Sequence, residues 1–312
     1  MKERTSFGNV LRVCDVLRVC AACTVFALAG EAAFASSEND GDAPAAADVP
    51  AAAPVPAAPQ PRKWLSLHAY ADIETAYVCR GYVWDSRPFS AQYVDAEIDL
   101  ADFGRLDGYV WTMSALSSKG HSTSMRNAYN EVDYGIKYSY DVKLAEDWTL
   151  VNSVCRQWVT NPGVRHNAHS LIDWQASQVL RNPFVTPYWK LRYIRRPYQA
   201  AYWCVGAFRS FALTDTLSFT IDFFGDLGNA RHFRHLFGPK PDHPGSDYNS
   251  GLHALNLVLR LDWQATEHLG FYAFAAQYSL VSHDARDAVH ASTAEEAKCD
   301  LTYGGVGMKL DF

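Results

Sequence analysis

The feature that most constrains this chain is a series of short segments in which apolar and polar residues alternate. In LNLVLRLDW, Leu259 and Leu261 fall on one face, and Arg260 and Asp262 fall on the other. Successive side chains of a β-strand point to opposite faces of a sheet, so this alternation predicts strands with one apolar and one polar face. About a dozen such segments of roughly 10 to 16 residues follow Trp64, a length that fits a tilted strand crossing a membrane.

The predicted strands occupy residues 64–80, 89–101, 106–118, 129–140, 147–158, 169–180, 185–195, 199–212, 215–227, 252–265, 268–282 and 299–312. They are rich in Tyr, Trp, Val, Leu and Thr, residue types that are common in strands. We find no segment with a convincing helical period. The sequence therefore predicts an all-β protein.

The connections between the segments distinguish a membrane barrel from a soluble sandwich. Short connections follow the second, fourth, sixth, eighth and tenth segments, whereas long polar ones occupy 119–128, 159–168, 228–251 and 283–298. The connection after the first segment is intermediate, and the one after the seventh is short. Long loops on one end and tight turns on the other are typical of outer-membrane proteins. We therefore predict a closed antiparallel transmembrane β-barrel of about 12 strands, in an up-and-down meander.

The N-terminal region has a different composition. Residues 1–35 combine a basic start, an apolar stretch at 21–30 and a small-x-small sequence at 33–35, which together predict a secretory signal peptide. Residues 36–63 form an Ala/Pro-rich region that predicts an extended periplasmic linker. Residues 64–312 then form the barrel.

No run of 18 apolar residues follows residue 36, which argues against a helical membrane protein. The expected location is the bacterial outer membrane. Both ends of the barrel domain fall on the side of the short turns, so we expect the linker and the C-terminus to be periplasmic.

Ten charged residues are predicted to face the barrel interior, because a charge turned to lipid at mid-depth costs about 2–4 kcal/mol. They are Asp95, Glu97, Asp99, Asp133, Asp222, Asp262, Lys137, Lys190, Arg192 and Arg260. Two interpretations stay open. The charges line a water-filled pore with a weak preference for cations, or they form a network of ion pairs that fills a narrow barrel.

Two other groups of residues raise alternatives. Histidines gather at 231–235, but no metal-ligand spacing accompanies them, and a solvated external loop is the favoured interpretation. His166, His169, Ser170 and Asp173 contain the residue types of a hydrolase triad. The motif of the outer-membrane phospholipases is absent there, so we predict no catalytic residues, no metal and no cofactor.

Four cysteines follow the predicted signal peptide, and Cys79 and Cys299 fall near the same end of the closing strands. A disulfide between them is conceivable in an oxidising compartment. Strand parity argues against it, because counting from Leu65 places Cys79 outward, and counting back from Phe312 places Cys299 inward.

Residues 73–101, IETAYVCRGYVWDSRPFSAQYVDAEIDLA, resemble the opening of the TorF-type family of outer-membrane porins. The matching positions are Thr75, Tyr77, Val78, Arg80, Gly81, Asp85 and Pro88. The resemblance covers the first hairpin well and the remainder only through the spacing of its strands. It implies an outer-membrane barrel with the architecture of a porin, and no particular solute.

The C-terminus resembles that of outer-membrane proteins in general, which end in an aromatic residue with apolar residues at alternating positions. Val306, Met308, Leu310 and Phe312 match this pattern, which the barrel-assembly machinery reads. The last strand would then pair with the first and close the barrel.

The function predicted from these features is passive diffusion of small polar solutes or ions through the outer membrane, without catalysis. The expected partners are outer-membrane lipid, the barrel-assembly machinery and the solutes themselves. A net charge of −6 gives no indication of a nucleic-acid partner. The alternative is a non-conducting structural or adhesive barrel whose external loops bind a partner.

Overall fold

The computed structural model describes residues 63–116, 131–160, 171–196, 199–241, 243, 245–292 and 298–312. The predicted signal peptide and nearly all of the predicted linker lie outside the described residues. Within them, no helix is long and apolar enough to cross a membrane.

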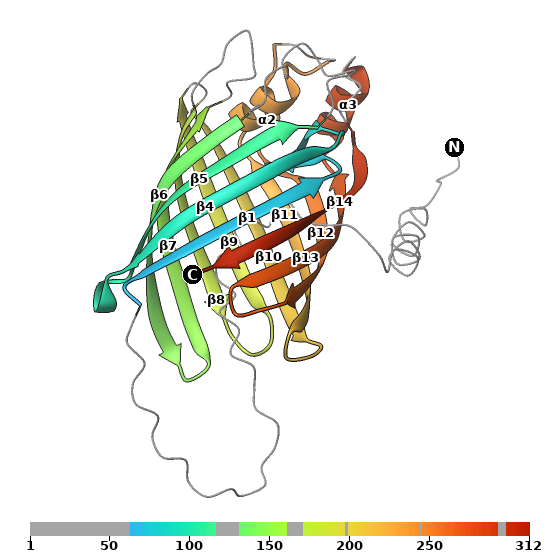
Figure 1. Cartoon of the computed structure of the whole chain (residues 1–312). Coiled ribbons are helices and arrows are strands. Elements are labelled where there is room, and N and C mark those ends of the chain that lie inside the picture. The colour runs from blue at the N-terminus through green and yellow to red at the C-terminus, as the bar shows by residue number, and fades with distance from the viewer. Residues whose placement is uncertain are drawn as a thin grey trace, which may run out of the picture.

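Twelve long strands form a closed antiparallel barrel in an up-and-down meander, which confirms the predicted fold (Figure 1). Each of the twelve predicted segments overlaps one of these strands. Their bounds are β1 Leu65–Glu74, β4 Phe89–Asp99, β5 Arg105–Ala115, β6 Glu131–Ala145, β7 Trp148–Thr160, β8 Leu171–Arg181, β9 Thr186–Arg196, β10 Ala200–Ala212, β11 Leu217–Gly228, β12 Gly251–Gln264, β13 Leu269–Leu280 and β14 Asp300–Asp311.

The first and last strands close the barrel, as the C-terminal pattern predicts. β1 pairs with β14 from His68 opposite Asp311 to Glu74 opposite Gly305. The backbone N–H of Phe312 donates to the carbonyl oxygen of Leu67 at 2.9 Å, which continues the ladder to the last residue. Closure leaves no unpaired sheet edge, which a hydrocarbon environment would not tolerate.

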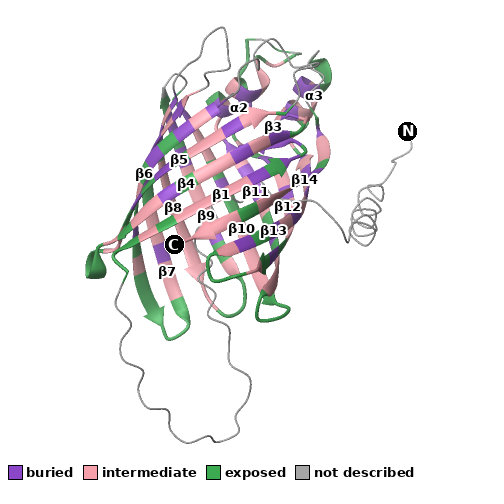
Figure 2. Cartoon of the chain, in the orientation of Figure 1, coloured by how far each residue is buried: buried purple, intermediate pink, exposed green. Residues whose placement is uncertain are grey.

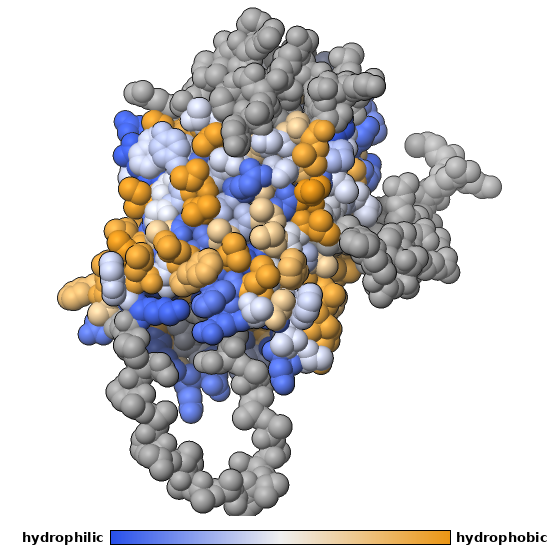
Figure 3. Space-filling model, in the orientation of Figure 1, coloured by the Kyte–Doolittle hydropathy of each residue, from blue (hydrophilic) through white to orange (hydrophobic). Residues whose placement is uncertain are grey.

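The two faces of the wall follow the predicted alternation. On β6, Ile136 is 54% exposed and points outward, whereas Asp133 is 6% exposed and points inward. Buried and exposed residues alternate along the strands in the same way (Figure 2). The outer surface carries many apolar side chains, and the lower end is hydrophilic (Figure 3). Such a surface matches a membrane-facing wall.

The two ends of the barrel differ in their connections. At the short-turn end, where β1 begins and β14 ends, the connections are 100–104, 146–147, 182–185, 213–216 and 265–268. The first contains the 3₁₀ helix η3, Ala101–Phe103. The opposite, long-loop end carries helices α2, Ala230–Phe237, and α3, His283–Ala291 (Figure 1). Predicted loop 119–128, and most of 159–168, lie outside the described residues.

The prediction of one continuous strand over 64–80 is wrong. β1 ends at Glu74, and the chain then forms a separate two-stranded hairpin, β2 Tyr77–Cys79 and β3 Tyr82–Asp85. We call it the inner hairpin, because Val78 and Val83 are buried inside the barrel. The resemblance to TorF-type porins therefore falls largely on this hairpin rather than on the wall.

The turn of the inner hairpin explains its Arg-Gly sequence. Arg80 and Gly81 have φ angles of 57° and 70°, the left-handed geometry that a two-residue type I′ loop requires. A Cβ on Gly81 would lie 2.2 Å from Nε2 of His253, so a larger residue does not fit.

The interpretation of the histidine-rich stretch as a solvated loop is also wrong. Residues 230–237 form α2, in which His232 and Phe233 are almost fully buried. The helix begins after Asn229, whose side chain accepts a hydrogen bond from the N–H of His232 at 2.9 Å, and it ends at Gly238 with φ of 74°. These are ordinary start and stop residues of a helix, so the sequence did carry the signal.

Candidate functional site: the barrel lumen

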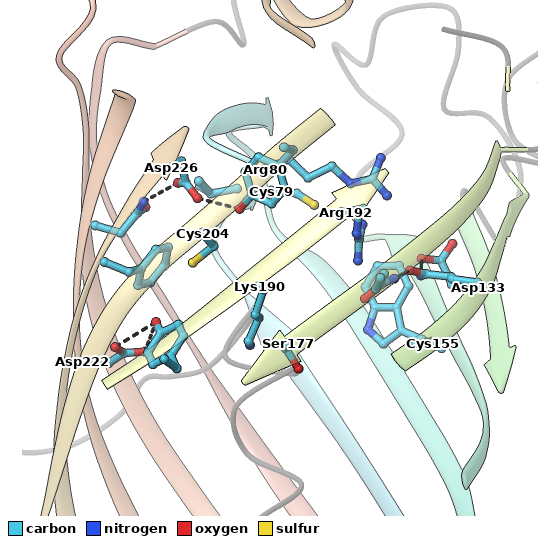
Figure 4. Close-up of a pocket in the computed structure, with 18 of the residues that line it drawn as sticks. Cys79, Arg80, Asp133, Cys155, Ser177, Lys190, Arg192, Cys204, Asp222 and Asp226 are labelled. Carbon is cyan, nitrogen blue, oxygen red and sulfur yellow. Dashed lines mark hydrogen bonds between the residues drawn. The ribbon is translucent and has the colours of Figure 1, made fainter. Parts of the chain in front are cut away.

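The barrel encloses a cavity of about 190 Å³, lined by apolar, aromatic and charged residues from all twelve wall strands and from the inner hairpin (Figure 4). A buried water needs about 10–15 Å³ by the same measure, so the cavity has room for roughly a dozen waters. Its charged lining consists of Asp72, Glu74, Asp133, Asp222, Asp226, Arg80, Lys137, Lys190, Arg192 and Arg260. Five acids and five bases therefore balance in the middle of the lumen.

The structure divides the predicted inner residues into two groups. Six of them line the cavity: Asp133, Lys137, Lys190, Arg192, Asp222 and Arg260. The other four lie toward the short-turn end, outside the cavity: Asp95, Glu97, Asp99 and Asp262. The sequence analysis missed the remaining cavity charges, Asp72, Glu74, Arg80 and Asp226. Asp72, Glu74 and Asp226 were detectable, because each lies at an inward position of its strand.

Ion pairs connect the inner charges at the short-turn end. Arg105 lies 3.5 Å from Glu97 and 2.9 Å from Asp141. Lys137 lies 3.2 Å from Asp107 across neighbouring strands. The two Arg105 pairs are partly exposed and therefore contribute little to stability, but they set the charge at this mouth of the barrel. Asp107 is buried, so solvent screens its pair with Lys137 less.

Tyrosine hydroxyls hold several of the carboxylates in the lumen. Tyr188 donates to Asp222 at 3.0 Å, and Tyr272 donates to Asp72 at 2.9 Å. Asp226 accepts from the hydroxyl of Tyr202 at 2.5 Å and from the amide of Asn256. These hydrogen bonds fix the carboxylates in place on the wall (Figure 4).

Three stacked tyrosines line the lumen on three neighbouring strands of the wall. Tyr70, Tyr93 and Tyr109 come from the neighbouring strands β1, β4 and β5, with ring centroids 4.8 Å and 5.7 Å apart. All three line the cavity. Aromatic side chains are common in strands, so nothing in the sequence marks these three as a unit.

The tip of the inner hairpin crosses the lumen and is held on both sides. The guanidinium of Arg80 lies 3.5 Å from the carboxylate of Asp173 on β8, which also lies 3.5 Å from the guanidinium of Arg192 on β9. On the other side, the carbonyl oxygen of Arg80 accepts from Nε2 of His253 at 3.2 Å and Nε2 of His232 at 3.4 Å. The hairpin therefore occupies the long-loop end of the lumen.

The placement of Cys79 corrects the parity argument, although the conclusion drawn from it holds. Cys79 lines the lumen rather than facing outward, because β1 ends five residues before it. Cys299 contacts α3 instead, with its Sγ 3.8 Å from Nε2 of His290. The structure therefore shows no disulfide between the two cysteines.

The hydrolase alternative receives no geometric support from the residues that the structure describes. His166, His169 and Ser170 lie outside them. The carboxylate of Asp173 forms ion pairs with Arg80 of the hairpin tip and Arg192 of β9. Among the described residues, no group of three or more potential metal ligands converges.

Comparison with known proteins gives architectural likeness only. No family model matches the chain, and no curated protein matches it. An outer-membrane channel from Pseudomonas putida F1 is 10% identical over 80% of this chain and 95% of that chain, with a TM-score of 0.48. The NanC porin is 9% identical over 79% and 98%, with a TM-score of 0.46.

The outer-membrane phospholipase A from Escherichia coli is 14% identical over 79% of this chain and 92% of that chain, with a TM-score of 0.41. Channels and an enzyme thus give similar scores, and none of these likenesses is close enough to transfer a function. The fold assignment rests on the strand pairing described above. The resemblance to the TorF-type family stays a prediction.

Proposed function

We propose that this protein is an outer-membrane channel, of the TorF-type porin family, through which small polar solutes or ions diffuse passively. The observation that carries the proposal is the combination of a closed barrel, an apolar outer wall and a charged internal cavity. A barrel that served only as a scaffold has no need to keep ten charged groups around internal space.

Transport through such a lumen requires no turnover and no cofactor. Water fills the space between the fixed charges, and a solute exchanges its hydration for contacts with them. Asp95, Glu97 and Asp99 give the short-turn mouth a row of acids, which favours cations at that end. The balanced charges of the cavity favour neither sign, so the overall preference for cations should be weak.

The proposed setting is the bacterial outer membrane, with the short turns and both ends of the barrel domain in the periplasm and the long-loop end outside. The wall faces lipid. The residues Val306, Met308, Leu310 and Phe312 serve as the recognition signal for the barrel-assembly machinery. Support for this role is that Phe312 forms the final backbone pair of the seam.

The test is single-channel conductance of the purified, refolded protein in a planar bilayer. Folding is checked first by the heat-dependent gel shift of an intact barrel. We expect stepwise ohmic openings with a weak preference for cations, and a lower preference in the variant Asp95→Asn, Glu97→Gln, Asp99→Asn. The control is Asp102→Asn, which removes an exposed acid in the turn and should leave the preference unchanged. A folded barrel that stays closed under every condition contradicts the proposal.

A second candidate is a non-conducting barrel whose external loops bind a partner. The observation in its favour is the inner hairpin, which occupies the long-loop end of the lumen. Replacing residues 77–85 with a short Gly/Ser linker separates the two. A channel conducts more after this change, and a barrel filled along its whole length does not.

A further inference from the structure

The most unusual feature of the lumen is that two buried histidine rings converge on one carbonyl oxygen at the hairpin tip. His232 on α2 and His253 on β12 are both fully buried, and their ring centroids lie 5.6 Å apart. Each places Nε2 within hydrogen-bond distance of the carbonyl oxygen of Arg80. A carbonyl oxygen only accepts, and it has two lone pairs, so both rings must carry a proton on Nε2.

This arrangement requires the histidines to be neutral. With Nε2 protonated, a second proton must go to Nδ1. Nδ1 of His232 has no hydrogen-bond partner among the residues that the structure describes. Protonation would therefore create a buried cation with an unsatisfied N–H, next to a second histidine and close to the guanidinium of Arg80.

Titratable groups from α2 and from three wall strands surround the two rings and the hairpin tip. On the side of α2, His235 faces Trp84 of the inner hairpin, with ring centroids 6.2 Å apart. From the wall, Tyr202 on β10 stacks near His232, Asp226 on β11 lies against Gly81, and Tyr278 on β13 donates to the carbonyl oxygen of Gly81.

Asp226 is the acid that lies against the turn. Its carboxylate accepts hydrogen bonds from the Tyr202 hydroxyl and the Asn256 amide, at 2.5 Å and 2.6 Å. Arg80 directs its guanidinium to Asp173, on the opposite side of the lumen. Two carbonyl contacts thus attach the hairpin tip on this side, the Tyr278 bond to Gly81 and the histidine bonds to Arg80, and the second depends on two neutral rings.

We propose that the inner hairpin is an acid-released gate of the lumen, with His232 and His253 as its latch. This inference rests on the proposed function and adds its regulation. Above neutral pH both rings donate to Arg80 and hold the hairpin across the long-loop end. At acid pH the protonated rings repel each other and Arg80, the hairpin leaves the wall, and the cavity opens toward the outside.

The direction of the pH effect follows from the helix histidines. Burial, followed by His253 and Arg80, holds the pKa of His232 well below its ordinary value of 6.5, and burial next to Arg80 lowers the pKa of His235 to about 4. The closed state therefore binds fewer protons than the open state. Closure is fully favoured above pH ~6.5 and weakens as the pH falls toward ~4. Between pH 7.5 and pH 5, a histidine with the lowered pKa of His235 shifts the equilibrium toward the open state by about thirtyfold.

The experiment measures open probability in planar bilayers between pH 7.5 and pH 5 for the full-length refolded protein. The test variant is His232→Gln with His253→Gln, because a glutamine amide donates like Nε2 and does not titrate. We expect the open probability of the wild type to rise steeply on acidification. That of the double variant should rise much less, by no more than the share of His235, which the variant keeps. A wild type with no pH response, or a double variant with the same response, overturns the gate.

A hairpin-replaced variant, with a Gly/Ser linker in place of residues 77–85, distinguishes the two proposals. If it conducts at every pH and the wild type shows no pH response, the channel stands and the gate is wrong. If it folds but never conducts, the channel itself is wrong. Should the double glutamine variant fail the gel-shift test, His232→Gln alone is measured. Its rise in open probability between pH 7.5 and pH 5 must then be clearly smaller than that of the wild type.

Discussion

The wall and the inner hairpin differ in how their residues obtain their environment. Along the wall, strand pairing fixes each position, and a residue two places away faces the same side. In the hairpin, Arg80 contacts residues that lie 93 to 173 positions away in the sequence, on β8, α2 and β12. A local pattern therefore determines the wall, whereas the hairpin is determined by contacts between segments that lie far apart in the sequence.

The largest loss of stability should come from removing the ion pair that joins the inner hairpin to the wall. Asp173 is completely buried and pairs with Arg80 of the hairpin and Arg192 of the wall. Asp173→Asn keeps the shape but leaves two arginines without this counter-charge, so we expect a loss of about 3–5 kcal/mol in the free energy of unfolding. Urea unfolding in lipid vesicles, followed by tryptophan fluorescence, measures it.

Asp141→Asn is the matched control for that prediction. Asp141 also pairs with an arginine, Arg105 at 2.9 Å, but the two side chains are 32% and 25% exposed. Because solvent screens such a pair, the expected loss is below about 1 kcal/mol. Equal losses in the two variants would show that the hairpin contact adds nothing to the barrel.

A second prediction tests the wall alone. Ile136 lies on the outer face in the middle part of β6 and is 54% exposed. Ile136→Arg should cost about 2–4 kcal/mol in the free energy of unfolding from lipid, because the guanidinium meets hydrocarbon. Val142→Arg, on the same face of the same strand but near the short turn, should cost about 0–1 kcal/mol. If the two variants are equally stable, this surface does not face a bilayer.

The same contrast explains how far the sequence could predict the structure. The alternation located every wall strand, the closing pair and the inward placement of residues such as Asp133 and Arg260. It failed at Thr75, where the chain leaves the wall. The alternation is interrupted there by the apolar run at 76–79, but such a run also fits a buried strand. The turn residues Arg80 and Gly81 mark a hairpin, but its position inside the barrel depends on Asp173 and the two histidines. No local period encodes contacts of that kind.

The helix α2 was also overlooked, although its ends are marked by Asn229 and Gly238. Its residues 231–235 are mostly charged or polar, so they resemble a solvated loop. Phe233, Leu236 and Phe237 pack inward at the i, i+3, i+4 spacing of a helix, but eight residues hold only one such repeat, which is too little for a periodic signal. A short helix that covers a hairpin buries only one side, and its capping residues carry more information than its hydrophobicity.

The smallest predicted effect uses those capping residues to separate the helix from the wall. Asn229→Ala removes the side-chain acceptor for the N–H of His232 and should destabilise α2 by about 1 kcal/mol. Amide hydrogen exchange should then be faster across 232–237, by about fivefold, and unchanged in β11 and β12. Ser282→Ala is the control, because Ser282 precedes α3 in the same position but makes no capping hydrogen bond. If the wall strands lose protection together with α2, the helix, the inner hairpin and the barrel open as one cooperative unit. The wall and the inner hairpin would then not differ in their dynamics.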